Sequence, residues 1–295
     1  MNKIKSLTKI LKKFDGLTNL NQLIEIHLFI KKNFRYKGDI IELGTFLGKT
    51  TKTITETVKK NSSIKIYSYD NFIWNWNHKR KFPKIKLNIN QNFLEYVRRK
   101  VNSKKVIFKK GLIEDINWQG KIIELLILDA PKNFDEINDI FFKLLPFFQK
   151  DITKIILLDF IISIKYDTQI FLSKINDNFS IEISKEGIAY LKYKKKINYK
   201  KFQTFKKEKK ASLKEINFFW NRMLNTFSEP VKKKLSLLPA LHMYDNKFYL
   251  DSIKFIFSKN VYVQKKYIIT KYMLKRYLLL IPSLIAQYIR GKYFI

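Results

Sequence analysis

The sequence contains no cysteine, and only 8 of its 295 residues are glycine and 6 are proline. The absence of cysteine excludes disulfides, thiolate zinc sites and cysteine nucleophiles, and it fits a reducing compartment. No stretch reaches the roughly 18 uninterrupted apolar residues of a membrane-spanning helix. Residues 1–14 are basic but lack the apolar run of a secretory signal. We therefore expect a cytoplasmic protein.

Acidic residues are also scarce, since 25 Asp and Glu stand against 59 Lys and Arg, for a formal net charge of +34. Residues 191–295 carry a net charge of +20, whereas residues 1–190 carry +14, so the tail is the basic region. A basic surface implies an acidic partner only loosely, and a composition rich in Lys, Ile, Asn and Phe produces the same charge without one. The hydrophobic content of 46% is ample for a folded core and excludes a disordered chain.

Residues 38–51 form the stretch around which the rest is organised. The short apolar run at 39–43 predicts a buried strand that carries Glu42, and helical periodicity resumes at residues 49–60. Between them, Gly44 allows backbone to approach a ligand where a Cβ would collide. The helix that follows offers unpaired N–H groups and the positive end of its dipole to an anion, with Thr50 nearby. The spacing of Gly44 and Gly48 excludes both the P-loop and the dinucleotide fingerprint.

Short apolar strands then alternate with helical segments. We expect strands at residues 39–43, 64–69, 105–109, 123–128, 154–158, 179–184 and 188–193. The helices are expected at residues 49–60, 87–101, 134–148 and 168–175, with two more within residues 2–36 that are separated by a break at residues 15–16. A loop rich in aromatic and basic residues is expected at residues 71–84. Buried strands between helices indicate a parallel sheet covered on both faces, and the last two strands must be antiparallel because a short turn joins them. A basic, mostly helical extension is expected at residues 196–295.

Acids stand at or near the ends of four of these strands: Glu42, Asp70, Asp129 and Asp159. In an open parallel sheet, ligands bind beyond the carboxyl ends of the strands, at the point where the strand order reverses. Asp70 follows Gly48 by 22 residues, which is close to the spacing at which an acid holds ribose hydroxyls in nucleotide-binding units. A carboxylate suits that position because it can accept from two hydroxyls at once.

The Glu-Leu-Gly-x-x-x-Gly motif, the order of elements and the acids at the strand ends resemble the class I S-adenosylmethionine-dependent methyltransferases. The resemblance covers residues 38–195 and implies an α/β fold with a doubly wound, mostly parallel seven-stranded sheet of the Rossmann-like type. The domains are then residues 1–37, 38–195 and 196–295. The resemblance implies that S-adenosylmethionine is bound by Glu42, Gly44, Thr45, Gly48, Thr50, Asp70, Glu114 and Asp115.

Residues 126–135 and 155–160 carry a narrower resemblance, to the macrocin-type O-methyltransferases of sugars and natural products. In that family, acids at the positions of Asp129 and Asp159 hold a divalent metal that binds substrate hydroxyls, which implies Mg²⁺ here. The chain departs from the family at Lys132, where the family has His, and only one acid stands at 159–160. Lys132 is suited to an anionic substrate group or, if desolvated, to a basic role. The candidates for removing the hydroxyl proton are Asp129, Asp159, Lys132 and His78.

The expected function is O-methylation of a sugar, glycan or related small hydroxylated acceptor. One alternative is an RNA methyltransferase that uses the basic C-terminal region as an electrostatic clamp. Against it, the sequence lacks the Asn/Asp-Pro-Pro-aromatic element of amino-directed base methylation. Another alternative is a non-catalytic interaction module of the same fold. The apolar segment 278–289 fits docking on the core, on a second subunit of a homo-oligomer, or peripherally on an anionic membrane.

Overall fold

The computed structural model describes residues 2–59, 63–129, 134–158, 160, 167–184, 186–198, 200, 212–226, 229 and 238–257. The chain divides into two compact units, residues 1–209 and residues 210–295. The N-terminal helices belong to the first unit, which also contains the whole sheet. No described helix is both long enough and apolar enough to cross a membrane.

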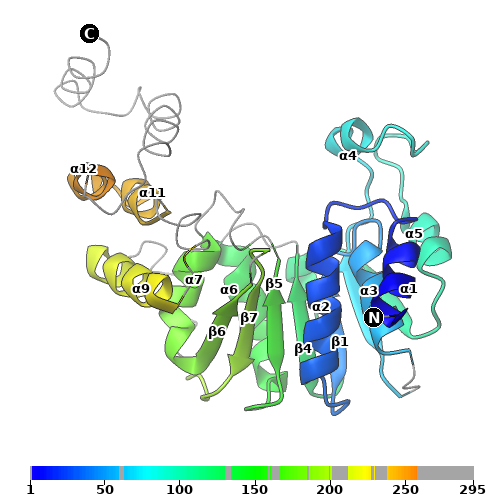
Figure 1. Cartoon of the computed structure of the whole chain (residues 1–295), viewed down its shortest axis with the longest axis horizontal. Coiled ribbons are helices and arrows are strands. Elements are labelled where there is room, and N and C mark those ends of the chain that lie inside the picture. The colour runs from blue at the N-terminus through cyan, green and yellow to red at the C-terminus, as the bar shows by residue number, and fades with distance from the viewer. Residues whose placement is uncertain are drawn as a thin grey trace, which may run out of the picture. The chain divides into compact units, whose positions relative to one another are not determined.

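Seven strands form a single sheet in the order β3-β2-β1-β4-β5-β7-β6 (Figure 1). Their bounds are Asp39–Leu43 for β1, Ile66–Asp70 for β2, Val106–Lys110 for β3, Ile123–Leu128 for β4, Lys154–Leu157 for β5, Phe179–Ile183 for β6 and Ala189–Tyr193 for β7. The first five strands are parallel, and β7 runs antiparallel to both β5 and β6. The predicted doubly wound, mostly parallel seven-stranded sheet is therefore confirmed. Strand order reverses between β1 and β4, which marks the expected ligand edge.

Helices cover the sheet because its central strands are apolar on both faces. On one face, α1 (Asn2–Leu11), α2 (Leu20–Asn33) and α3 (Lys49–Thr57) bury Leu11, Ile26 and Ile54 in one cluster with Ile40 and Ile127 of the strands. Right-handed crossovers in opposite directions from the reversal point place α3 and α6 (Phe134–Leu144) on opposite faces. Next to α6, α7 spans Asp167–Ile175. Short 3₁₀ turns occupy Ile113–Asp115, Leu145–Phe147 and Asn176–Asn178.

The start of β1 is fixed at the amino-terminal ends of the parallel strands, on the opposite side of the sheet from their carboxyl ends. Glu124 is fully buried in β4, and its carboxylate accepts hydrogen bonds from the backbone N–H groups of Arg35, Lys37 and Gly38. A Cβ on Gly38 would lie 2.3 Å from the carbonyl oxygen of Ile122, so the chain can enter β1 this closely only with glycine. These contacts hold the register that places Glu42 and Leu43 at the other edge.

The segment after β2 differs from the sequence prediction. Residues 71–84 were expected to be a loop, but Asn75 caps a short helix, α4 (Trp76–Lys81), by accepting from the N–H of His78 at 3.0 Å. The following helix, α5 (Leu94–Val101), begins later than the expected residue 87. The reason is tertiary, because residues before Phe93 pair with the chain near Ile73 instead of entering a helix.

The second unit contains three described helices, α9 (Leu213–Thr226), α11 (Leu238–Asp245) and α12 (Tyr249–Phe257). Trp220 Nε1 of α9 donates to His242 Nδ1 of α11 at 3.0 Å, and both side chains are buried. Ser252 Oγ of α12 donates to the carbonyl oxygen of Ala240 at 2.7 Å. The predicted apolar segment 278–289 lies outside the described residues.

Candidate functional site

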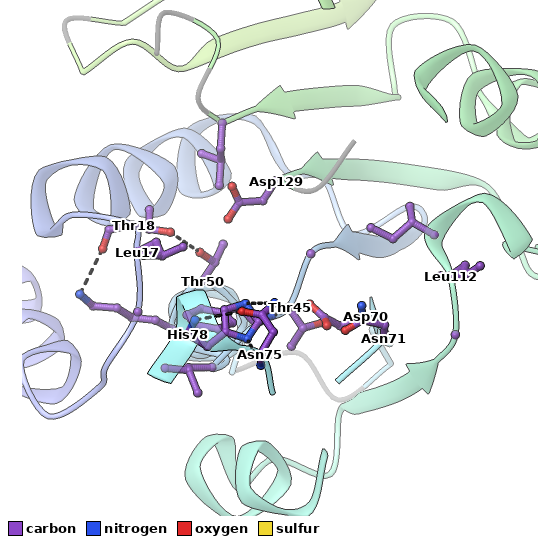
Figure 2. A pocket seen from close by; sticks show the side chains of 18 of the residues that line it. Leu17, Thr18, Thr45, Thr50, Asp70, Asn71, Asn75, His78, Leu112 and Asp129 are labelled. Carbon is purple, nitrogen blue, oxygen red and sulfur yellow. Dashed lines mark hydrogen bonds between the residues drawn. The ribbon is translucent and has the colours of Figure 1, made fainter. Parts of the chain in front are cut away.

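A cavity of about 450 Å³ lies at the carboxyl ends of the central strands (Figure 2). Its walls come from the bend between β1 and α3, the end of β2, the loop between α1 and α2, the start of α4, the chain after β3, and Asp129 after β4. In the view of Figure 2, Asp70 and Asn71 lie on the side of Leu112, whereas Thr50 and Thr18 lie on the side of Asp129. The cavity therefore lies at the point of strand reversal, as the sequence predicted.

The bend between β1 and α3 is closed by its own backbone. The N–H groups of Gly44 and Thr45 both donate to the carbonyl oxygen of Tyr69, at 2.9 and 3.2 Å. Gly44 adopts a φ of +99° and lines the cavity together with Thr45. Gly48 has a φ of +79° and is the N-cap residue immediately before α3, but it is not among the lining residues. A Cβ there would lie 2.6 Å from Val101 Cγ2, so Gly48 is required for the packing of α3 against α5.

Asp70 is the acid at which the bend and β2 meet. Its Oδ2 accepts a hydrogen bond from the N–H of Phe46 at 2.8 Å, and its Oδ1 accepts from the N–H of Phe72 at 2.9 Å. Both phenylalanines adopt left-handed backbone conformations, with φ values of +45° and +52°. Burial raises the pKa of Asp70, and the two backbone N–H groups oppose that rise. The side chain lines the cavity, so one carboxylate anchors both strand ends and also faces the ligand space.

Glu42 takes a supporting position instead of the direct contact expected from the sequence. Its side chain is fully buried and is not among the residues that line the cavity. The carboxylate accepts from Thr51 Oγ1 at 2.6 Å and from Ser68 Oγ, while Oε1 has no hydrogen-bond partner among the residues that the structure describes. Burial raises the pKa of Glu42 to about 7. The residue joins β1, β2 and α3 beside the bend.

This burial predicts a pH-dependent stability. The pKa of Glu42 is raised from 4.5 to about 7 by burial, so the folded state holds the proton more tightly than the unfolded chain. Its unfavourable contribution is absent below pH 4.5, grows as pH rises, and is complete above about pH 7. At that point it costs about 3 kcal/mol. Glu42→Gln should remove this dependence, as measured by urea unfolding of wild type and variant from pH 4.5 to 8.

The matched control is Glu182→Gln, which changes an exposed glutamate on the edge strand β6. This control should follow the wild-type pH dependence. If the Glu42→Gln and wild-type curves remain parallel over the same pH range, Glu42 does not titrate with a raised pKa.

His78 lies on α4 among aromatic rings and lines the cavity. Its ring centroid is 4.8 Å from that of Phe46, 5.2 Å from that of Trp74 and 6.3 Å from that of Phe93. Burial lowers the pKa of His78, and the nearby Asp70 carboxylate opposes that change. The structure therefore places His78 at the wall near Asp70.

Several cavity residues had no distinctive sequence signal. Gly16, Leu17 and Thr18 come from the loop between α1 and α2, which the sequence suggested only as a helix break. Thr18 Oγ1 lies 3.3 Å from Thr50 Oγ1, and Lys49 Nζ donates to the carbonyl oxygen of Thr18 at 3.1 Å. Burial lowers the pKa of Lys49. Lys49 fitted the helical pattern, but only the fold shows that it lines the cavity.

The remaining predicted site residues divide into three groups. Thr50 and Asp129 line the cavity. Asp115 is exposed and is not among the lining residues, whereas Leu112 and Ile113 just before it are. Lys132, Asp159 and the side chain of Glu114 lie outside the described residues. The described part of the chain contains no group of three acidic, histidine or cysteine side chains that could hold a metal ion.

No family model matches the sequence, and a search of curated proteins finds no match. Solved structures of similar fold include the O-methyltransferase NovP, with 15% identity and a TM-score of 0.47 over 60% of this chain and 81% of that chain. CalS11, a calicheamicin methyltransferase, has 13% identity and a TM-score of 0.46 over 65% of this chain and 91% of that chain. The O-methyltransferase TomG from Streptomyces achromogenes was solved in complex with S-adenosylmethionine. It has 12% identity and a TM-score of 0.42 over 66% of this chain and 90% of that chain. At such identities and TM-scores the function has to rest on the site itself.

Proposed function

We propose that the chain is an S-adenosylmethionine-dependent methyltransferase that acts on an oxygen of a sugar, glycan or related small hydroxylated acceptor. The observation that carries the proposal is the meeting of Asp70 with the bend: Asp70 Oδ2 lies 2.8 Å from the N–H nitrogen of Phe46, in the wall of a cavity of about 450 Å³. That volume lies within the range of small-molecule sites. The position at the strand reversal is where nucleotides bind in doubly wound sheets.

The residues around the cavity fit a nucleoside with an amino-acid tail. A carboxylate offers about four acceptor positions, and backbone N–H groups use two of those on Asp70. The remaining positions are suited to the two hydroxyls of a ribose. Leu112 and Ile113 offer an apolar surface for the base.

The opposite end of the cavity is suited to the amino-acid tail. Thr50 and the start of α3 offer a hydroxyl and the positive end of a helix dipole. Lys49 adds an ammonium group that is held by the carbonyl oxygen of Thr18. Asp15 is near enough to oppose the lowering of the Lys49 pKa by burial, but no ion pair joins the two among the described residues, and the ammonium is suited to the carboxylate of the ligand.

S-adenosylmethionine, when bound, supplies a methyl group that is already activated by the sulfonium. The protein then has to hold the acceptor hydroxyl in line with that group and to take its proton. We assign to Asp129 the role of the base that removes this proton. Its backbone N–H donates to the carbonyl oxygen of Leu43 at 2.9 Å, and its side chain lines the cavity. His78 is the second candidate from the described residues, and it lies nearer the ribose end beside Asp70.

The proposed Mg²⁺ site depends on Asp129 and Asp159. Asp159 lies outside the described residues, and Asp129 alone does not form a metal site among those that are described. Mg²⁺ ordinarily needs one or two carboxylates together with water and substrate oxygens. Mg²⁺ binding therefore remains a prediction that rests on the pairing of Asp129 with Asp159.

The proposal is tested by calorimetry of the full chain with S-adenosylhomocysteine, the product form of the methyl donor. We expect saturable binding with one site per chain and a dissociation constant in the micromolar range. Absence of binding at millimolar ligand would overturn the proposal. Binding followed by methyl transfer from labelled donor to RNA, with no transfer to hydroxylated sugars, would favour the RNA alternative instead.

A further inference from the structure

The segment between β2 and α5, residues 71–92, forms an arm that leaves the strand-end edge of the sheet (Figure 1). Two stretches of backbone pair at its base: Trp74 N–H donates to the carbonyl oxygen of Gln91 at 2.9 Å, and Asn90 N–H donates to that of Trp74 at 2.7 Å. Beneath them, Phe72, Trp74 and Phe93 are almost completely buried. The arm is thus an ordered element with its own aromatic base, and its outer end carries α4.

The two sides of α4 have different surroundings. Asn75 and His78 line the cavity, and His78 packs on Phe46 of the β1–α3 bend. Trp76 is 70% exposed, and Lys79 Nζ lies 5.7 Å from the centroid of its ring. An exposed tryptophan one residue away from a cavity residue is a surface on which a ring of a ligand can stack. The arm therefore extends the cavity wall outward onto a second surface.

The charge of this arm is of one sign. It carries five lysine and arginine residues and no acidic residue, and all five are exposed: Lys79, Arg80, Lys81, Lys84 and Lys86. None of these five forms an ion pair with a carboxylate among the described residues, whereas Lys52, Lys59 and Arg98 elsewhere in the same unit do. Unpaired cations gathered at the mouth of a cleft raise the local concentration of anions and favour phosphate.

The inside of the cavity is lined by three acids, Asp70, Asp129 and Glu136, and by one cation, Lys49. Asp70 and Lys49 are assigned to the methyl donor, so Asp129 and Glu136 face the acceptor, and carboxylates suit hydroxyl groups and would repel a phosphate. A ligand that matches both regions places its hydroxyls inside and its negative charge at the mouth. From this arrangement we infer that the methyl acceptor is a hydroxylated ring that carries phosphate, which the arm residues Lys79, Arg80 and Lys81 hold outside the cavity. The inference rests on the proposed function, since it names the acceptor class of the same site.

The chemistry of phosphate is shared by a sugar phosphate and by a sugar linked to a nucleoside diphosphate. The test uses the full chain saturated with S-adenosylhomocysteine and titrates it in a calorimeter with glucose 1-phosphate and, separately, with uridine diphosphate glucose. We expect at least one of them to bind. The triple variant Lys79→Gln/Arg80→Gln/Lys81→Gln should weaken that binding by about tenfold or more, since each lost phosphate contact is a charge-assisted hydrogen bond. The probe that binds more tightly shows whether the acceptor is a sugar phosphate or a sugar linked to a nucleoside diphosphate.

The matched control removes the same number of charges from the opposite edge of the sheet. Lys31→Gln/Lys32→Gln/Lys37→Gln changes three exposed lysines at and after the end of α2 and should alter the affinity by less than about twofold. The inference fails if neither probe binds at millimolar concentration, or if both triple variants lose affinity equally. It also fails if an oligouridylate binds more tightly than both probes, because that result identifies a polynucleotide surface.

Failure of this inference is distinguishable from failure of the proposed function. Affinity for S-adenosylhomocysteine is measured first on wild type and on both triple variants, and none of the substituted residues is assigned to that ligand. If wild type binds S-adenosylhomocysteine but neither phosphate probe, only the assignment of the acceptor is wrong. If wild type does not bind S-adenosylhomocysteine, the proposed function is wrong.

Discussion

Replacing Asp70 with asparagine should weaken binding of S-adenosylhomocysteine by about 100-fold or more. Two ribose hydroxyls lose a charged acceptor, and hydrogen bonds to a charged group contribute about 1.5–3 kcal/mol each. The substituted amide can accept through only one atom, so it also leaves the N–H of Phe46 or of Phe72 facing a donor. Calorimetry of the purified variant measures the loss, and a thermal melt shows how much of it accompanies unfolding.

Asp151→Asn is the control for a carboxylate of no assigned role. Asp151 is exposed and pairs with Lys194 at 2.8 Å, at the opposite edge of the sheet from the cavity. Its replacement should leave binding unchanged within about twofold, as is usual for an exposed ion pair. If folded Asp70→Asn binds as tightly as wild type, the ligand does not rest on this carboxylate and the cofactor assignment is wrong.

Replacing Asp129 with asparagine should lower kcat by about 10²- to 10³-fold, within the usual contribution of a general base. Binding of S-adenosylhomocysteine should change by less than about threefold, because Asp129 is assigned to the acceptor and not to the methyl donor. The measurement is single-turnover methyl transfer from labelled donor to whichever of the two phosphate probes binds, together with the steady-state rate that gives kcat. The separation of turnover from donor affinity is the feature that a loss of folding would not reproduce.

His78→Gln provides the comparison for that experiment. If His78 is the base, its substitution lowers kcat more than that of Asp129. The wild-type rate then also falls as pH drops through the pKa of the imidazole, which burial places below its ordinary value of 6.5. If the methyl-transfer rate depends on Asp129 and does not change as pH passes through the pKa of the imidazole, the carboxylate of Asp129 is the base.

The layout of the sheet could be predicted from the sequence because its signals are local. Strand β4 consists of apolar residues apart from Glu124, and its predicted bounds match those of the structure. The antiparallel pairing of β6 with β7 followed from the length of the turn between them. Asp70 stood out by its spacing from Gly48, and the structure places it at the cavity.

The parts that could not be predicted depend on contacts between distant segments. The placement of Thr18 next to Thr50 is set by how α2 packs on the sheet, and no motif records it. Glu42 had a motif position, but only the packing shows that Thr51 and Ser68 surround its carboxylate. The sequence of the arm predicts only a loop, because its base forms by the pairing of two stretches almost twenty residues apart, near Ile73 and near Asn92.

Asp70 gives the two halves of the cavity a common anchor. Through Phe46 it holds the bend beside the proposed methyl donor, and through Phe72 it holds the root of the arm assigned to the acceptor. The phenyl ring of Phe46 also lies against Trp74 and Phe82 of that arm. Donor and acceptor should consequently bind with positive cooperativity, each ordering a wall that the other uses, and substitutions at Asp70 should remove that coupling in addition to weakening donor binding.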